Sequence, residues 1–291
     1  MTDPPEAVLS VDFELFSHTP AYRQATGSTP NGSIGIDGGE FLRAQLSEHD
    51  VSSTFFVVSS VGETHPGVIE NLAADGHEIG SHTHTHRLLT ELDPSTRLEE
   101  LERSKETLEA LTGTTVTGFR APAFDFGADH FDMLGAASYE YDSSVVASRA
   151  IPGWYGGEYT LQKPAPATAV EADAPSSVAE LPVNVMPGIR LPLTGTWLRF
   201  FGPGYTILGM KLLARQGVTP VLYVHPWEFV DLPTIKGVPR RVYWHTGQWM
   251  RRAVQRILDA DFAFITAQDA LQDGGVRAVD GSAEGSKRGE R

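Results

Sequence analysis

The sequence predicts an α/β protein in which short buried strands alternate with amphipathic helices. Two observations support this class. Runs of apolar, β-branched and aromatic residues recur along the chain, and segments with helical apolar spacing lie between them. Polar residues also gather where the apolar runs end, as they do at the C-terminal strand ends of parallel α/β barrels. A chain of 291 residues suits one barrel-like domain or two small domains.

The first half of the chain contains four predicted strands, at residues 7–13, 53–59, 77–80 and 116–120. Three helices are predicted between them, at residues 41–49, 66–75 and 94–111. The last of these opens on an Asp-Pro-Ser-Thr sequence that can cap a helix, and it stops at Gly113. Residues 15–38 are rich in Gly, Ser, Thr, Pro and Asn and are predicted to be a long loop, a feature that is often functional.

The second half is less regular at first and then returns to the α/β pattern. Residues 145–200 carry many Pro and Gly residues and predict irregular strands and loops that elaborate the barrel. Helices follow at 205–216 and 246–258, and strands at 218–224 and 262–266. We therefore expect one domain over residues 1–273. Residues 274–291 are Gly, Ser and charged residues, which predict a disordered tail.

The composition is acidic, with 37 acids against 23 bases and a net charge of −14. Nucleic acids and anionic membranes both bind basic patches, so this balance argues against either partner. Lys is scarce and Cys is absent, which favours adaptation to high salt over an ordinary acidic protein. Zero Cys excludes disulfides, thiolate catalysis and Cys-ligated zinc.

The N-terminus has neither a basic region nor an apolar region of a signal peptide. The most apolar long stretch, residues 200–214, is too short and too interrupted to cross a bilayer. We therefore expect a cytoplasmic protein without a transmembrane segment.

Two histidines four residues apart, His82 and His86, follow the strand predicted at residues 77–80. Side chains at this spacing share one face of a helix, and in a loop after a strand they can also converge on one ion. We expect His84, which lies between them, to point away. The alternative is a set of three surface histidines in a threonine-rich loop.

Two carboxylates, Asp12 and Glu14, lie at the end of the first predicted strand. Residues i and i+2 of a strand share a face, so both carboxylates point the same way. Two such carboxylates repel each other and lose hydration energy on burial, unless a nearby cation offsets this cost. Two imidazoles and one carboxylate make a facial metal site, and a second carboxylate beside it can act as a base. The alternative is a pair of solvated acids in a turn.

Arg120 and His225 also end predicted strands. A guanidinium in this position can hold a carboxylate base through a bidentate pair. A histidine before the rigid Pro226 suits a positioned general acid. The alternatives are a surface salt bridge for Arg120 and a capped core histidine for His225.

These segments, together and in this order, resemble the polysaccharide deacetylase superfamily, the carbohydrate esterase family four type. The resemblance extends from residue 7 to about residue 270. It rests on three motifs, which are Gly76-His-Glu-Ile-Gly-Ser-His-Thr-His-Thr-His86, Phe119-Arg-Ala-Pro-Ala-Phe124 and Leu222-Tyr-Val-His-Pro226. The first motif departs from the commonest form, which has two adjacent acids, because Phe13 separates the acids here. A subgroup with a Ser-Val-Asp-x-Asp/Glu first motif and a His-Pro-Trp-Glu final motif resembles the chain at both places.

The resemblance implies a distorted TIM-like (β/α)7 barrel, with residues 1–273 as the catalytic domain. It also implies a role for each matched residue: Asp12 as the general base, Arg120 as the residue that orients it, His225 as the general acid, and Glu14, His82 and His86 as metal ligands. The family's fourth motif, an acid and a Trp that tune the catalytic histidine, has only Glu180 and Trp197 as weak candidates.

The activity that the resemblance implies is metal-dependent removal of N-acetyl groups from an amino-sugar-containing polysaccharide, glycolipid or other glycoconjugate. The expected ion is Zn²⁺, with Co²⁺, Mn²⁺ and Ni²⁺ as alternatives, and no organic cofactor is expected. Four aromatic residues of the middle region are candidates for stacking on sugar rings, although they suit core packing equally well: Trp154, Tyr155, Tyr159 and Trp197.

Two alternatives to the predicted deacetylase activity stay open. Some relatives that resemble this chain cleave other C–N bonds, in cyclic amides or formamides. A barrel that has lost activity and only binds carbohydrate is the second alternative. The sequence predicts neither the sugar nor the oligomeric state.

Overall fold

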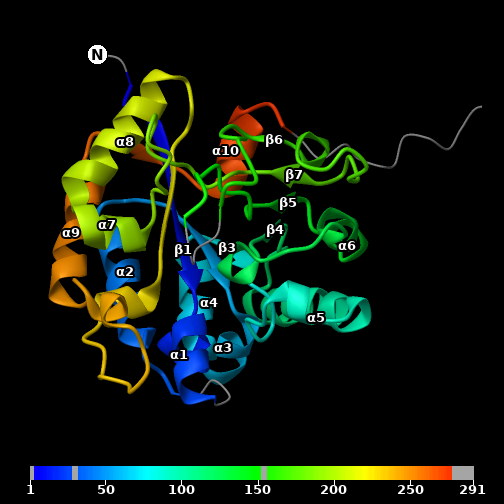
Figure 1. Ribbon diagram of the computed structural model, residues 1–291, viewed down its shortest axis with the longest axis horizontal. Helices are drawn as coiled ribbons and strands as arrows, with labels where there is room; N and C mark the ends of the chain where they lie inside the picture. Colours follow the sequence, from blue (N-terminus) through cyan, green and yellow to red (C-terminus); the bar gives the residue numbers. More distant parts are fainter. Residues whose placement is uncertain (1–2, 28–31, 152–155, 277–291) are drawn as a thin grey trace, which may run out of the picture.

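A curled nine-stranded sheet forms the centre of the molecule, and helices cover its outer side (Figure 1). The computed structural model describes residues 3–27, 32–151 and 156–276. The sheet follows the order β6-β7-β5-β4-β3-β2-β1-β8, and β9 pairs with β1. The strands are β1 Glu6–Phe13, β2 Thr54–Val57, β3 Glu78–Ser81, β4 Gly118–Phe119, β5 Tyr141–Asp142, β6 Ala165–Pro166, β7 Ala179–Glu180, β8 Val221–Val224 and β9 Ala263–Phe264.

Nearly every pairing between these strands is parallel, the exception being β6 with β7. The sheet therefore behaves as an incompletely closed TIM-like barrel, and the predicted α/β class is confirmed. The helices are α1 Pro20–Thr26, α2 Ile36–Glu48, α3 Ser59–Thr64, α4 Pro66–Ala74, α5 Pro94–Thr112, α6 His130–Ala136, α7 Gly195–Phe201, α8 Pro203–Arg215, α9 Gln248–Leu258 and α10 Ala267–Asp273. None of the helices in the described part of the chain has the length and apolarity needed to cross a membrane.

The strongest helix signals of the sequence are confirmed. α5 starts after Asp93, whose side chain accepts hydrogen bonds from the backbone N–H groups of Ser95 and Thr96, both at 3.1 Å. It ends before Gly113, which has a φ of 69° and closes the helix in the left-handed region. α4, α8 and α9 also lie within a few residues of their predicted positions.

The loop predicted over residues 15–38 is wrong in part, because it contains α1 and the start of α2. α1 is a short helix that depends on local capping instead of an apolar stripe. The side chain of Thr19 accepts a hydrogen bond from the backbone of Tyr22 at 3.3 Å, and Pro20 occupies the first helical position. α3 and α6 were not predicted either, since helices of six and seven residues offer too few turns for a periodic pattern.

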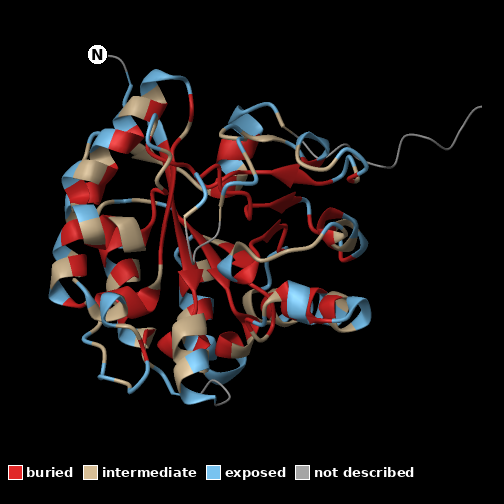
Figure 2. Cartoon of the chain, viewed as in Figure 1, coloured by how far each residue is buried: buried red, intermediate tan, exposed pale blue. Residues whose placement is uncertain are grey.

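Alternation along the strands separates two apolar clusters. In β1, Ala7, Leu9, Val11 and Phe13 pack toward the helices, whereas Val8 belongs to the cluster inside the curl of the sheet. In β8, Leu222 and Val224 face the helices, and Val221 and Tyr223 face inward. Because the side-chain period of a strand is two, Asp12 and His225 follow the inward-facing series of their strands. Figure 2 shows that the central strands are buried, β8 throughout and β1 from Ala7 onward.

Two strand glycines leave room for aromatic rings inside the curl. A Cβ at Gly118 would lie 2.2 Å from the hydroxyl and ring of Tyr141, and one at Gly80 would lie 2.7 Å from the ring of Phe56. These distances are shorter than any van der Waals contact. The sheet interior is therefore packed against the glycine backbone at these two positions.

We predict that Gly118→Ala destabilises the protein by about 1–3 kcal/mol, because Tyr141 must move to admit the methyl group. Gly67→Ala is the matched control, since nothing lies within 4 Å of a Cβ there and the residue is helical. Denaturant unfolding should show a lower midpoint for the first variant and an unchanged or higher midpoint for the second. Equal midpoints for both variants would contradict this account of the interior.

Candidate active site

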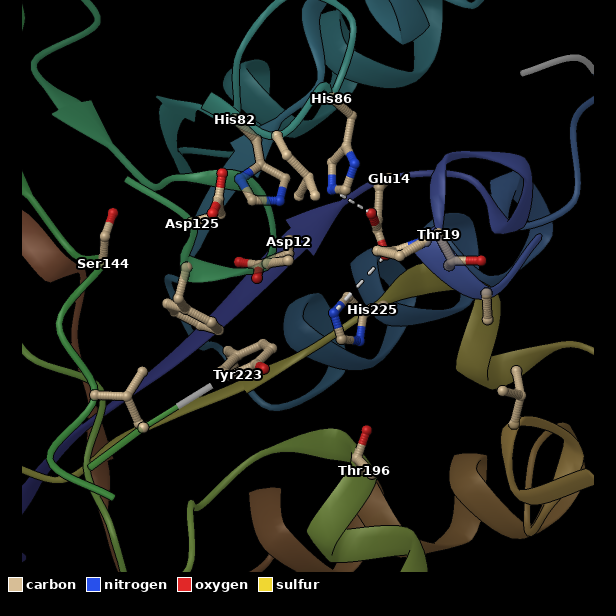
Figure 3. Close-up of a pocket in the computed structure, with 18 of the residues that line it drawn as sticks. Asp12, Glu14, Thr19, His82, His86, Asp125, Ser144, Thr196, Tyr223 and His225 are labelled. Carbon is tan, nitrogen blue, oxygen red and sulfur yellow. Dashed lines mark ion pairs between the residues drawn. The ribbon is translucent and has the colours of Figure 1, made fainter. Parts of the chain in front are cut away.

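Glu14, His82 and His86 converge at the C-terminal edge of the sheet (Figure 3). One ligand atom from each residue lies within 4.8 Å of the others, and all three residues are buried. His86 Nε2 and Glu14 Oε2 approach to 2.5 Å, but Oε2 has no hydrogen bond of acceptable geometry among the described residues. A buried carboxylate oxygen facing two imidazoles without a donor is the arrangement expected of an ion-binding site. The donor set fits a divalent cation such as zinc.

Hydrogen bonding fixes the tautomer of His82. Its Nδ1 lies 2.7 Å from the carbonyl oxygen of Arg120, which can only accept, so Nδ1 carries the proton. The lone pair of Nε2 is then free for an ion. Burial lowers the pKa of His82 to about 4, which keeps the ring neutral at physiological pH. Burial alone would raise the pKa of Glu14, but His86, His225 and His82 outweigh it and hold this pKa below its usual value.

The loop that carries the histidines is held from both sides. Arg23 of α1 donates to the carbonyl oxygens of His86 and Thr85 at 2.7 and 2.8 Å. Glu100 of α5 accepts from the backbone N–H groups of His84 and Thr85 at 3.1 and 2.8 Å. His86 itself has a φ of 58°, which a non-glycine residue adopts only when its surroundings require it. His84 points away from the cluster, and its Nδ1 lies 2.8 Å from the hydroxyl of Ser59.

Asp12 and Arg120 form a buried ion pair beside this cluster. The Nη1 group of Arg120 donates to Asp12 Oδ1 at 2.6 Å and to Ser10 Oγ at 2.9 Å. Its Nε and Nη2 groups donate to the carbonyl and hydroxyl oxygens of Ser143 at 3.0 and 2.8 Å. The guanidinium also lies over the ring of Phe56, 4.2 Å from its centre. The position of the Asp12 carboxylate is therefore fixed by a charged partner that is itself held at several points.

His225 lies on the other side of Glu14, 3.9 Å from Nε2 to Oε1 (Figure 3). Its Nδ1 lies 3.2 Å from Oε2 of Glu228, and Arg199 donates to Oε1 of the same carboxylate at 2.7 Å. Burial would lower the pKa of His225, but the Glu228 carboxylate, with help from Glu14 and Asp12, raises it. The ring is therefore easier to protonate than a free imidazole. Trp227 stacks on His225 and donates from Nε1 to Glu14 Oε1 at 2.9 Å.

These side chains line a pocket of about 820 Å³, within the range of small-molecule sites. Its lining also includes Thr19, Phe124, Tyr159, Tyr223 and Arg241, of which Arg241 is exposed. Trp197 is not part of the lining, and it stacks instead on Phe201. Trp154 and Tyr155 lie outside the described residues.

The structure brings all six predicted site residues to one end of the sheet: Asp12, Glu14, His82, His86, Arg120 and His225. Sequence reasoning missed the roles of three further residues, namely Ser143, Arg199 and Glu228. The only available signal was the motif that contains Glu228, three residues after His225. Glu228 contacts His225, whereas the weak candidate Glu180 does not belong to this cluster.

Glu180 instead accepts a hydrogen bond from the backbone of Val145 at 3.0 Å and interacts with Asp142. Both carboxyl groups are fully buried. Burial and the neighbouring Asp142 carboxylate raise the pKa of Glu180 well above its usual value. Burial opposes ionisation of Asp142 as well, but His130, 3.2 Å away, lowers the pKa of Asp142. When the pair holds one proton, that proton therefore lies on Glu180. Ser144, which lines the pocket, donates to Asp142 at 2.6 Å and links the pair to the site.

Two family models match the chain. The first, described as polysaccharide deacetylase, matches residues 42–141, and the second, described as a domain of unknown function (DUF3473), matches residues 143–272. His82, His86 and Arg120 lie in the first region, and His225 lies in the second. The second region also supplies β8, which pairs with β1 and so completes the site.

A peptidoglycan-N-acetylglucosamine deacetylase from Bacillus cereus is 30% identical over 78 residues, which are 27% of this chain and 28% of that protein. The chain spans about half or less of the length of the first curated relatives that it matches.

Solved structures share the fold. A putative polysaccharide deacetylase from Mycobacterium smegmatis superposes with a TM-score of 0.61 at 22% identity, over 100% of this chain and 97% of the other. The Puue allantoinase superposes with a TM-score of 0.62 at 15% identity, over 92% of this chain and 89% of the other.

We predict that Glu180→Gln flattens the pH dependence of stability. The raised pKa of Glu180 means that its contribution is fully present below the pKa of the unfolded chain and is lost as pH rises through the pKa of the folded state. As pH rises from about 4.5, the ordinary pKa of a glutamate, urea midpoints should fall more steeply for the wild type than for the variant. Glu158→Gln, at an exposed glutamate, is the control and should follow the wild type. Parallel curves for wild type and Glu180→Gln would contradict the assignment of the proton.

Proposed function

Because the chain belongs to the polysaccharide deacetylase superfamily, we propose that it is a divalent-metal-dependent hydrolase that removes the acetyl group from an N-acetylated amino sugar. The sugar would be part of a polysaccharide, a glycolipid or another glycoconjugate. The observation that carries the proposal is the placement of a buried, Arg-bound carboxylate and a histidine with a raised pKa around one three-ligand cluster.

Glu14, His82 and His86 would hold the ion, and Zn²⁺ fits their donor set, with Co²⁺, Mn²⁺ and Ni²⁺ as alternatives. A divalent ion at this position supplies Lewis acidity, which polarises an acyl carbonyl and lowers the pKa of a water molecule. Trp227 holds Oε1 of Glu14 through a hydrogen bond and so leaves Oε2 for the ion.

Asp12 would act as the general base that accepts a proton from the attacking water. Its ion pair with Arg120 fixes the orientation of the carboxylate, and orientation is a large part of what a positioned base contributes. Ser10 of β1 and Ser143, which follows β5, hold the guanidinium in turn, so a hydrogen-bond network keeps the base in position.

His225 would donate a proton to the leaving nitrogen. An amide nitrogen leaves readily only when it is protonated, so the acid must carry its proton before bond cleavage. Glu228 raises the pKa of His225 and orients its ring through Nδ1, which leaves Nε2 directed toward the pocket side where Glu14 lies. Arg199 holds Glu228 in place.

The pocket also bears on the substrate. Its volume of about 820 Å³ accommodates one or two sugar rings, and the aromatic side chains of Tyr159 and Tyr223 in its wall suit stacking on them. The nearest rival is cleavage of a cyclic amide, which is suggested by the fold that the chain shares with an allantoinase. Assays on a panel of acetylated sugars and cyclic amides separate the two activities. A bound ion without turnover of any amide would instead favour a carbohydrate-binding barrel.

We predict that Asp12→Asn and His225→Ala each lower kcat on an N-acetylated oligosaccharide by at least about 100-fold, as expected for loss of a general base or acid. Both variants should still bind one divalent ion, because neither residue belongs to the ligand cluster. Released acetate measures turnover, and elemental analysis measures the ion. Full activity in either variant would overturn the role given to that residue.

A further inference from the structure

An apolar surface adjoins the pocket on the side of α7 and α8. Four large hydrophobic residues are strongly exposed among the described residues, and three of them are Phe201, Leu208 and Trp244, at 52%, 52% and 53% exposure. Ring contacts join this region: Trp197 stacks on Phe201, and Phe200 meets Trp244 edge-on, at 5.7 and 5.4 Å between centres. We call the following set the aromatic face: Trp197, Phe200, Phe201, Tyr205, Leu208 and Trp244.

The aromatic face continues into the pocket without a break. Phe200, whose ring contacts both Trp197 and Trp244, is also part of the pocket lining. Thr196, one residue before Trp197, lines the pocket as well (Figure 3). Figure 2 shows exposed and half-buried stretches along α7 and α8, on the outside of the molecule. A ligand that leaves the pocket on this side would therefore meet apolar surface.

A free cation lies at the junction. Arg241 lines the pocket, and within the described ranges no hydrogen bond or ion pair of its side chain is present. The other guanidinium in the lining, Arg199, is already bound to Glu228. The side chain of Arg241 is exposed to solvent where it lines the pocket, so it is accessible to an anionic group of a ligand. It provides a fork of donors that matches a phosphate group.

Arg241 lies in a turn that is held by hydrogen bonds and that adjoins the aromatic face. The 3₁₀ helix Arg240–Tyr243 carries it, and Nη1 of Arg199 donates to the carbonyl oxygens of Val242 and Trp244, both at 2.9 Å. Trp244 directly follows this helix as its C-cap, and its backbone N–H donates to the carbonyl oxygen of Arg241 at 3.3 Å, so the two residues belong to one turn. Arg199 thus fixes both the Glu228 carboxylate behind His225 and the turn that carries the cation.

We propose that the substrate is a lipid-linked amino sugar, in which a phosphate joins the N-acetylated sugar to a single hydrocarbon chain. This inference rests on the proposed function. The sugar would occupy the pocket, the phosphate would bind Arg241, and the chain would lie along the aromatic face. On the protein, the pocket is followed by the arginine and then by the apolar surface. In the ligand, the sugar is followed by the phosphate and then by the hydrocarbon chain. A neutral glycan would use the pocket but would leave Arg241 without an anion.

The test compares one N-acetylated amino sugar in three forms: the methyl glycoside, the 1-phosphate and the farnesyl phosphate conjugate. We expect kcat/KM to rise roughly tenfold from the first form to the second, as a charge-assisted hydrogen bond to phosphate allows, and to rise again for the third. Arg241→Gln should remove the gain due to phosphate. Arg240→Gln, which makes the same charge change one residue away and outside the pocket lining, should keep it.

The hydrocarbon contact has its own variant. Phe201→Ser combined with Leu208→Ser should remove the gain due to the farnesyl chain and keep the gain due to phosphate. Ile189→Ser is the matched control, because Ile189 has a similar exposure of 49% and is not part of the aromatic face. Equal kcat/KM for the three forms would overturn the inference, as would equal losses in Arg240→Gln and Arg241→Gln.

Calorimetric binding of the farnesyl phosphate conjugate to the same proteins separates this inference from the proposed function. Hydrolysis of all three forms at equal rates would sink the inference and leave the deacetylase intact. Binding that depends on Arg241, without hydrolysis of any form, would support the inference and contradict the deacetylase. Absence of both binding and hydrolysis would contradict both.

Discussion

The buried guanidinium of Arg120 is the charge around which the end of the sheet is arranged. It has no exposed surface, and a charge removed from water is costly unless it is paired and hydrogen-bonded. Asp12 of β1 pairs with it, and Ser143, which follows β5, accepts two of its hydrogen bonds. The carbonyl oxygen of Arg120 also fixes the ring of His82. One residue therefore positions both the proposed base and a proposed metal ligand.

The same constraint explains why the two halves of the chain form one site. β8 comes from the region of unknown function and pairs with β1, so its inward-facing series ends at His225 beside Glu14. Glu228 and Arg199, from the same region, then set the charge and orientation of the histidine. The polysaccharide deacetylase region alone, at residues 42–141, contains neither the two carboxylates of β1 nor this histidine. The site therefore forms only when the sheet places β8 of the second region beside β1.

The sequence predicted what strand periodicity and family motifs encode. Strand alternation predicted that Asp12 and Glu14 share a face, and the caps at Asp93 and Gly113 located α5. It did not predict α1 or α3, whose stability comes from capping and packing instead of a repeated apolar stripe. It also missed the contacts that Glu228 and Arg199 make, because partners 29 residues apart meet only through the fold. Adaptation to high salt and the limits of the C-terminal tail stay predictions.

The proposed mechanism requires Glu14, His82 and His86 to bind one ion, and the metal content of the purified protein measures this directly. Wild type, His82→Ala and His84→Gln should be loaded with zinc, dialysed in high-salt buffer and analysed for metal per chain. We expect about one ion in the wild type and in His84→Gln, whose side chain points to Ser59, and none in His82→Ala. An empty wild type after loading, or equal loss in both variants, would contradict the site at the centre of this account.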